Sequence, residues 1–281
     1  MESKSIQKLI NRAVEILQRS AIPRPRLEAE ILLAFVLNCS RVSLHSQGDR
    51  EVEEFFAESF FRLIKRRSLY EPIEYLTEKV SFYGEELYVS QGALIPRPET
   101  EILVDKALGI IAQYRCKNIA EIGIGSGAIS VILAHLSGDS SLSFHASDIS
   151  PEALFNARVN QMRFNVVNLT LHHSAYLDFN TQLGVPFDLL ISNPPYIRNN
   201  EKIPESLAYE PKCALFGGER GDEVLLKVID TARAFRIPYL VCEMGYDQQR
   251  SVQDYFGAIP HKSLEFYQDL AGLSRGFVAE F

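Results

Sequence analysis

The stretch Asn118-Ile-Ala-Glu-Ile-Gly-Ile-Gly-Ser-Gly-Ala128 decides the fold. Asn118–Ile122 is largely apolar, which predicts a short buried strand, and the three glycines that follow predict a tight turn into a helix over Ala128–Leu136. Glycine has no side chain, so the backbone N–H groups of this turn can approach a ligand at the positive end of the helix. The stretch therefore predicts a ligand-binding loop in a strand–helix unit.

Strands and helices alternate on the C-terminal side of this loop. Strands are predicted over 142–147, 167–172, 187–192 and 239–243, with helices over 151–164, 222–235 and 248–256. Two final runs, 263–267 and 276–281, predict a last β pair. Alternation of this kind is typical of a doubly wound, largely parallel α/β sheet with helices on both faces.

On its N-terminal side the chain divides differently. Helical periodicity runs from Ser3 or Ser5, as possible caps, through a helix that starts at Pro25 and ends near Asn38, to a third helix that Asp49 can cap. Alternation around a glycine turn predicts a β-hairpin at 79–90. We therefore expect a helical domain over 1–78, a hairpin linker over 79–98 and an α/β domain over 99–281.

Composition excludes several protein classes. The 281 residues are 46% hydrophobic and 23% charged, with a net charge of −7, which argues against disorder and against a globally basic nucleic-acid binder. The longest apolar run, Ile31–Leu37, is shorter than a membrane span, and the N-terminus lacks the apolar core of a signal peptide. A cytoplasmic protein without a membrane partner is expected. Four dispersed cysteines and six dispersed histidines predict no metal site.

Two carboxylates accompany the glycine loop. Asp148 ends the next predicted strand, where a carboxylate can accept hydrogen bonds from both hydroxyls of a ribose. Glu121, two residues before Gly123, can face a cationic group such as the amino group of S-adenosylmethionine. The pattern Gly123-x-Gly125-x-x-Ala128 also satisfies the loose NAD(P) fingerprint. The loop therefore predicts a nucleoside-bearing cofactor and leaves its identity open.

Asn193-Pro-Pro-Tyr196 follows the buried strand 187–192, at the strand end where open α/β sheets bind ligands. An amide or exocyclic amine is a poor nucleophile because its lone pair is delocalised, so it needs orientation more than a strong base. The Asn193 side-chain oxygen and the Pro194 carbonyl can each accept one N–H of such an NH2 group, and Tyr196 can stack on its plane. The tetrapeptide predicts transfer to a planar nitrogen.

Beside a cofactor loop, this tetrapeptide resembles that of the amino-methylating class I S-adenosylmethionine-dependent methyltransferases. The resemblance implies S-adenosylmethionine as cofactor and a seven-stranded Rossmann-like sheet with an antiparallel last strand. By itself it leaves open adenine, cytosine and protein glutamine as substrates.

Further blocks resemble the PrmC/HemK family of peptide-chain release factor glutamine N5-methyltransferases. They include Arg66-Arg67, Glu71-Pro-Ile-x-Tyr75-Leu, Leu94-Ile-Pro-Arg-Pro-Glu-Thr-Glu101, Tyr209-Glu-Pro211, Ala214-Leu-Phe-Gly-Gly218 and Glu243-x-Gly245. The resemblance implies that the substrate is the glutamine of the Gly-Gly-Gln loop of class I release factors. Because the helical domain carries no catalytic group, we expect it to recognise this partner, and the net charge of −7 argues against direct binding of nucleic acid. The alternatives are an adenine N6-methyltransferase and a glutamine methyltransferase of a ribosomal protein.

The resemblance also implies a role for each matching residue. The cofactor's methionine part lies on Gly123, Ile124, Gly125, Ser126 and Gly127, with Glu121 behind them and its ribose on Asp148. The substrate glutamine lies on Asn193, Pro194, Pro195 and Tyr196, and Asn193 also approaches the cofactor. Tyr176 takes the place near the adenine that the family often fills with tryptophan. Ala175 departs from the family, which commonly has an acidic residue there.

Overall fold

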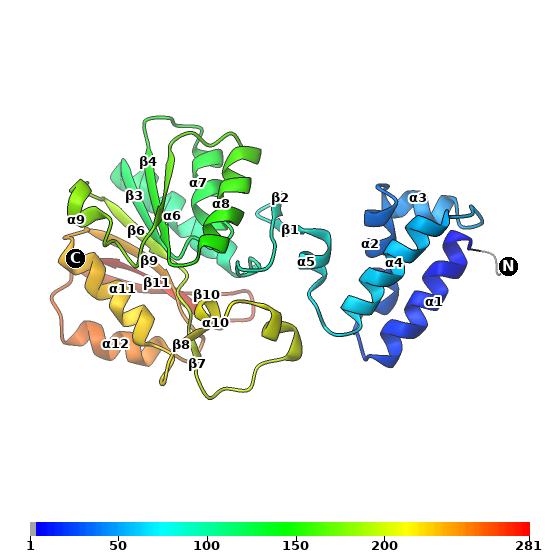
Figure 1. Ribbon diagram of the computed structural model, residues 1–281. Helices are drawn as coiled ribbons and strands as arrows, with labels where there is room; N and C mark the ends of the chain where they lie inside the picture. Colours follow the sequence, from blue (N-terminus) through cyan, green and yellow to red (C-terminus); the bar gives the residue numbers. More distant parts are fainter. Residues whose placement is uncertain (1–3) are drawn as a thin grey trace. The chain divides into compact units, whose positions relative to one another are not determined.

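The computed structural model describes residues 4–281, and these form two compact units (Figure 1). The first unit runs to Lys79 and includes the separate segment Pro204–Tyr209. The second comprises Val80–Ile203 and Glu210–Phe281. Within the described part of the chain, no helix has the length and apolar content that crossing a bilayer requires.

The first unit is helical and has its own apolar core. In its first helix the buried residues Ile6, Leu9, Ile10, Ala13 and Leu17 follow the predicted periodicity. They pack with the buried faces of the second and fourth helices. The elements of this unit are α1 (Ile6–Arg19), α2 (Pro25–Val36), α3 (Arg41–Ser46), α4 (Glu54–Arg67), α5 (Ile73–Thr77) and the 3-10 helix η1 (Glu205–Tyr209).

Some predicted details of this unit are wrong. Helix α4 follows an N-cap at Glu53, so Asp49 does not cap it. Ser5 occupies the N-cap position of α1 without a side-chain cap bond, and Ser3 lies outside the described residues. Helices α3 and α5 were not predicted because six and five residues carry too little periodic signal. Ser40 caps α3 by accepting a hydrogen bond from the N–H of Ser43 at 3.2 Å.

The basic run at the end of α4 is largely committed to internal pairing. Arg67 is 9% exposed and pairs with the carboxylate of Glu28 on α2. Arg66 forms a bidentate pair with Glu71, with N–O distances of 2.7 and 2.6 Å. Both arginines therefore form ion pairs that stabilise the helical unit.

The second unit contains the predicted seven-stranded sheet, in the order β10-β11-β9-β6-β3-β4-β5. Strands β9, β6, β3, β4 and β5 pair in parallel, and β11 is antiparallel to β9, as the class I resemblance predicted. The strands are β3 (Asn118–Ile122), β4 (Ser143–Asp148), β5 (Leu169–His173), β6 (Leu189–Ser192), β9 (Tyr239–Glu243), β10 (Ser263–Gln268) and β11 (Ser274–Glu280).

Helices cover both faces of this sheet, because the strands are apolar on both sides. Ile119 of β3 belongs to a core with α6 (Thr100–Tyr114), α7 (Ala128–Ser137) and α8 (Pro151–Arg163). The next residue, Ala120, belongs to the opposite core, with α11 (Glu223–Ala234) and α12 (Gln249–Gly257). Figure 1 shows these two groups of helices on either side of the strands.

Shorter elements complete the unit. Strands β1 (Lys79–Phe82) and β2 (Glu85–Tyr88) form a two-stranded sheet around the turn at Gly84. The parallel pair β7 (Ile197–Arg198) and β8 (Phe216–Gly218) was not predicted, nor were the single-turn helices α9 (Asn180–Leu183) and α10 (Lys212–Leu215). A Cβ atom at Gly217 would lie 2.4 Å from the carbonyl oxygen of Pro195. Only glycine lets β8 pack this closely on the Asn193–Tyr196 turn.

Asn160 on α8 joins three parts of this unit. Its Oδ1 accepts from the N–H of Tyr88 at 2.7 Å, and its Nδ2 donates to the carbonyls of Tyr88 and Ser126, each at 2.8 Å. The side chain is fully buried. One amide therefore satisfies backbone groups of strand β2 and of the glycine loop.

We predict that Asn160→Ala lowers the free energy of unfolding by about 2–4 kcal/mol, because it leaves buried backbone groups without partners. Urea unfolding followed by circular dichroism measures the change. Asn200→Ala, at an exposed position, is the control and should change stability by less than ~0.5 kcal/mol. Equal stability of the two variants would contradict the role of Asn160.

Candidate active site

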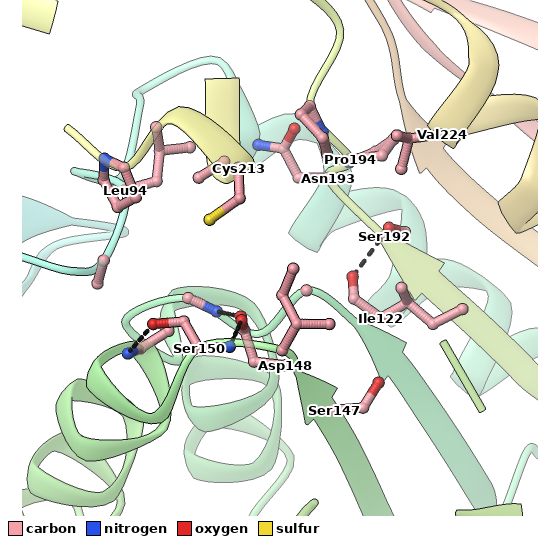
Figure 2. A pocket seen from close by; sticks show the side chains of 18 of the residues that line it. Leu94, Ile122, Ser147, Asp148, Ser150, Ser192, Asn193, Pro194, Cys213 and Val224 are labelled. Carbon is pink, nitrogen blue, oxygen red and sulfur yellow. Dashed lines mark hydrogen bonds between the residues drawn. The ribbon is translucent and has the colours of Figure 1, made fainter. Parts of the chain in front are cut away.

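A cavity of about 210 Å³ opens at the carboxyl ends of β3, β4 and β6 (Figure 2). Figure 2 shows Leu94, Cys213 and Asn193 along one side of it and Asp148 and Ser150 along the other. Parallel neighbours end at the same edge of a sheet, so three separate loops meet there. The lining residues are Gly92, Ala93, Leu94, Ile122, Gly123, Gly125, Ser147, Asp148, Ile149, Ser150, Ala153, Ser174, Ala175, Tyr176, Ser192, Asn193, Pro194, Pro195, Pro211, Cys213, Ala214 and Val224.

The glycines of the loop after β3 are needed for different reasons, one for helix packing and two for an open cavity wall. Gly123, Gly125 and Gly127 all have positive φ, at 77°, 56° and 87°. A Cβ atom at Gly127 would lie 2.9 Å from Cγ2 of Val131 and 3.2 Å from Cα of Ala157, so this glycine lets α7 and α8 pack closely. A Cβ atom at Gly123 or Gly125 meets nothing within 4 Å, and both residues line the cavity. These two glycines keep the wall open for a ligand.

Asp148 is held in place by backbone N–H groups. Its Oδ2 accepts from Gly125 at 3.0 Å and its Oδ1 accepts from Ser150 at 2.9 Å. Burial raises the pKa of Asp148, and these hydrogen bonds act in the opposite direction. The N-cap of α8 is Ser150, whose hydroxyl accepts from Ala153 at 3.1 Å. Asp148 therefore presents a fixed acceptor to the cavity, suited to vicinal hydroxyls.

Glu121 precedes the glycine loop and is 1% exposed. Its Oε2 accepts from the N–H of Ser130 at 3.0 Å and from the Ser130 hydroxyl, whereas its Oε1 has no hydrogen-bond partner among residues 4–281. Burial raises the pKa of Glu121 to about 8. A buried carboxylate oxygen without a donor is costly, and a cation at the loop would remove that cost. Glu121 does not itself line the cavity.

The tetrapeptide divides between the cavity and the interior. Asn193, Pro194 and Pro195 line the cavity, and Tyr196 does not. The Nδ2 of Asn193 donates to the hydroxyl of Thr100 at 3.1 Å. The phenol of Tyr196 interacts with Glu243, and burial raises the pKa of Tyr196 to about 12. Stacking of Tyr196 on a substrate stays a prediction.

The cavity brings together seven of the twelve residues predicted for the site: Gly123, Gly125, Asp148, Tyr176, Asn193, Pro194 and Pro195. The other five do not line it: Glu121 is buried at the end of β3, the loop residues Ile124, Ser126 and Gly127 are buried, and Tyr196 lies off the cavity. Ala175 lines the cavity beside Tyr176, so the wall has a methyl group where the family commonly has a carboxylate.

Several walls of this cavity were not predicted from the sequence. The 92–94 segment carries one wall, and Pro211, Cys213, Ala214 and Val224 contribute another. Glu210 links the two segments that carry them: its Oε2 accepts from the N–H of Ile95 at 3.0 Å and its Oε1 from Nη2 of Arg97 at 2.5 Å. The resemblance blocks at Leu94–Glu101 and Tyr209–Pro211 were the available signal.

These features fit S-adenosylmethionine. The buried Glu121 carboxyl behind the loop can supply negative charge for its cationic methionine part, the open glycines leave room for that part, and Asp148 suits its ribose. NAD would place its anionic pyrophosphate at this loop and offers no cation there. A seven-stranded sheet with an antiparallel β11, this loop and Asn193-Pro-Pro-Tyr196 at the same edge define a class I S-adenosylmethionine-dependent methyltransferase.

Comparison with known proteins identifies the family. Residues 8–77 match the PrmC N-terminal domain and residues 100–210 the methyltransferase small domain. The chain is 33% identical over 259 residues to the release factor glutamine methyltransferase of Clostridium acetobutylicum, with 90% of each chain covered. It is 34% identical to that of Koribacter versatilis, with 86% of this chain and 87% of the relative covered. The chain belongs to the release factor glutamine methyltransferase family.

Other similarities agree on the fold or on part of a longer protein. The chain is 34% identical to the bifunctional methyltransferase of Rickettsia typhi, of which it spans 56%. The N-terminal domain of human METTL16 is similar in structure, with a TM-score of 0.54 at 14% identity and 78% of this chain and 82% of that one covered. At this identity the structural similarity shows the fold alone.

We predict that Gly125→Val abolishes measurable S-adenosylmethionine binding by calorimetry, because its side chain would enter the cavity. The matched control is Gly138→Val at the C-cap of α7. Gly138 has a φ of 57° and Gly125 one of 56°, and a Cβ atom at either meets nothing within 4 Å. Both variants carry the same backbone strain, of about 1–3 kcal/mol. If the two bind the cofactor equally, the loop is not part of the site.

We predict that Glu121→Gln stabilises the ligand-free protein at pH 8.5 by about 1–3 kcal/mol and leaves its stability near pH 5 almost unchanged. The folded-state pKa of about 8 lies above the unfolded value of ~4.3, so this carboxyl costs stability increasingly as pH rises between those two values. Thermal unfolding at both pH values measures the effect. Glu265→Gln, at an exposed position on β10, is the control.

The same variant should weaken S-adenosylmethionine binding at least about tenfold, because an amide cannot neutralise the cofactor's cation. Calorimetry at pH 8.5 measures this. Tighter binding by Glu121→Gln would show that Glu121 does not face the cation.

Proposed function

We propose that this protein transfers the methyl group of S-adenosylmethionine to the side-chain amide nitrogen, N5, of the glutamine in the Gly-Gly-Gln loop of class I release factors. The observation that carries the proposal is the position of Asn193 and Pro194 at the wall of the cofactor cavity, in a chain of the release factor glutamine methyltransferase family. Methylation of this loop would modulate translation termination in the cytoplasm.

The chain's own residues orient the nucleophile. When bound, the cofactor supplies an electrophilic methyl group. The carbonyl of Pro194 accepts one N–H of the glutamine, and Oδ1 of Asn193 accepts the other. Proline has no N–H that would compete for that amide, and its φ is fixed. Two acceptors hold the nitrogen in line with the methyl group, so positioning supplies much of the rate. The methylated nitrogen releases its proton to water, and no strong base is needed.

Two other substrates are less well supported. An adenine N6-methyltransferase must flip its base and neutralise phosphates with Lys and Arg, yet this chain carries a net charge of −7. A ribosomal-protein glutamine methyltransferase shares the tetrapeptide but resembles the Leu94–Glu101 block less well. The family comparison favours the release factor as the substrate.

The helical unit is the release-factor-binding domain in this proposal. A shallow groove between α2 and α4 is lined by Phe35, Val36, Phe55, Phe56 and Leu63, together with Ser59, Arg62 and Arg66. Phe55 is 67% exposed and Phe35 is 42% exposed, which is unusual for large aromatic side chains. Exposed aromatics beside arginine are typical of protein–protein contact surfaces.

We predict that Asn193→Ala lowers kcat for methylation of intact release factor by about 10²–10³, by analogy with the loss of one transition-state hydrogen bond. The dissociation constant of S-adenosylmethionine should change by less than about threefold, since Asp148 and the glycine loop stay intact. Labelled cofactor and mass spectrometry of the Gly-Gly-Gln peptide measure the product. Turnover at the wild-type rate would remove Asn193 from the mechanism.

We predict that Phe55→Ser, alone or with Phe35→Ser, raises KM for release factor at least about tenfold without changing cofactor binding, because aromatic anchors dominate such contacts. Val42→Ser on α3 is the matched control, since Val42 is 77% exposed but lies outside the groove. If KM for release factor is the same in Phe55→Ser, in the Phe35→Ser/Phe55→Ser double variant and in Val42→Ser, the groove does not bind the release factor and the proposal for this unit fails.

A further inference from the structure

Two buried residues lie behind Asn193 and take no part in the mechanism above. Thr100, at the start of α6, is 3% exposed, and Glu243, at the end of β9, is 2% exposed. Nδ2 of Asn193 donates to Oγ1 of Thr100 at 3.1 Å, and Oγ1 of Thr100 donates to Oε2 of Glu243 at 2.8 Å. The two residues come from different sequence blocks, Leu94–Glu101 and Glu243-x-Gly245, and neither lines the cavity.

The order of these hydrogen bonds follows from what each group can donate. An ionised carboxylate only accepts, so Glu243 takes the single hydroxyl proton of Thr100. The Thr100 oxygen is then left only with lone pairs toward Asn193, and it accepts from an N–H. The NH2 end of the Asn193 amide therefore faces Thr100, and its other branch, Oδ1, is the acceptor.

The orientation of this amide decides whether it can help the reaction. A glutamine NH2 that approaches Oδ1 meets an acceptor. If the amide were rotated by half a turn, two NH2 groups would face each other, and one of the two acceptors for the glutamine would be lost. Asparagine has no intrinsic preference between the two orientations, so its surroundings must decide.

We propose that Thr100 and Glu243 are positioning residues that hold the Asn193 amide with its oxygen available to the substrate glutamine. The inference deepens the proposed function and rests on it. Tyr196 adds to the same arrangement, because its phenol also interacts with Glu243. One buried carboxylate thus anchors the first residue of the tetrapeptide through Thr100 and the last residue through its phenol.

The charge of Glu243 follows from its surroundings. Burial raises the pKa of Glu243 to about 7, and the nearby Glu99 charge acts in the same direction. The hydrogen bond from Thr100 and the Arg275 guanidinium act in the opposite direction and lower this pKa. The titratable and charged groups that interact with it are Glu99, Tyr196, Tyr267 and Arg275, together with Cys242 on the opposite face of β9. Above pH ~7 the carboxylate is ionised and the chain of hydrogen bonds has one direction. Below pH ~7 the protonated acid can donate to Thr100, and that direction is lost.

Two substitutions at position 100 separate positioning from packing. Thr100→Val keeps the shape and removes the hydroxyl, whereas Thr100→Ser keeps the hydroxyl. We expect Thr100→Val to lower kcat for release-factor methylation about 10- to 100-fold, with an unchanged dissociation constant for S-adenosylmethionine. Thr100→Ser should stay within about threefold of wild type. Wild-type rates for Thr100→Val, or equal losses in both variants, would overturn the proposal.

A double-mutant cycle tests whether Thr100 acts through Asn193. In an Asn193→Ala background, Thr100→Val should cause no further loss of kcat, because there is no amide left to orient. Two independent losses that multiply would overturn the proposal.

The pH dependence of kcat tests Glu243. Wild type should lose kcat as pH falls through about 7, and Glu243→Gln should lack this dependence. If kcat of Glu243→Gln falls below pH ~7 in the same way as that of wild type, Glu243 does not belong to the chain of hydrogen bonds.

A measurement without substrate distinguishes failure of this inference from failure of the proposed function. In ligand-free, ¹⁵N-labelled protein, the Asn193 side-chain NH2 signals are identified by their absence in Asn193→Ala. Their protons should be protected from exchange with water in wild type and Thr100→Ser, and should exchange at least about tenfold faster in Thr100→Val. If wild type does not methylate release factor but these signals behave as expected, only the substrate assignment fails. Equal exchange in all three proteins overturns the positioning role.

Discussion

Parallel pairing of β4, β3, β6 and β9 is the constraint on which the site depends. Its register places Ser147, Ile122, Ser192 and Cys242 in one row across the sheet. The next residue of each strand or loop is therefore at the same edge, and these residues are Asp148, Gly123, Asn193 and Glu243. A one-residue slip in any strand would turn its last side chain to the other face of the sheet and dismantle the site.

Two buried carboxylates follow from this geometry. Glu121 and Glu243 are each at most 2% exposed, and burial raises the pKa of both above the ordinary range. Each costs folding free energy in the ligand-free protein near neutral pH, because a carboxyl that is ionised in the unfolded chain must on folding either take up a proton or keep its charge in a medium of low polarity. In the proposed reaction, Glu121 would act on the cofactor side of the site and Glu243 on the substrate side. In this view, stability is reduced at the two places where charge and orientation are needed.

In the proposed function, recognition of the partner and chemistry belong to different units. The residues that line the cavity all belong to the second unit, and the exposed aromatic groove belongs to the first. The first unit holds itself together through its own core and through the buried Arg67–Glu28 pair.

The sequence by itself determined the fold class, the glycine loop, Asp148 and the position of Asn193, since each is a local pattern: a strand, a turn or a strand end read from neighbouring residues. The tertiary structure decided what depends on residues far apart in the chain. Thr100, Asn193 and Glu243 span more than half of the chain, and no local pattern joins them. The same holds for the wall formed by Cys213 and Val224 and for the burial of Arg67. The reason is physical: orientation, burial and the direction of a hydrogen bond depend on which side chains meet across the sheet.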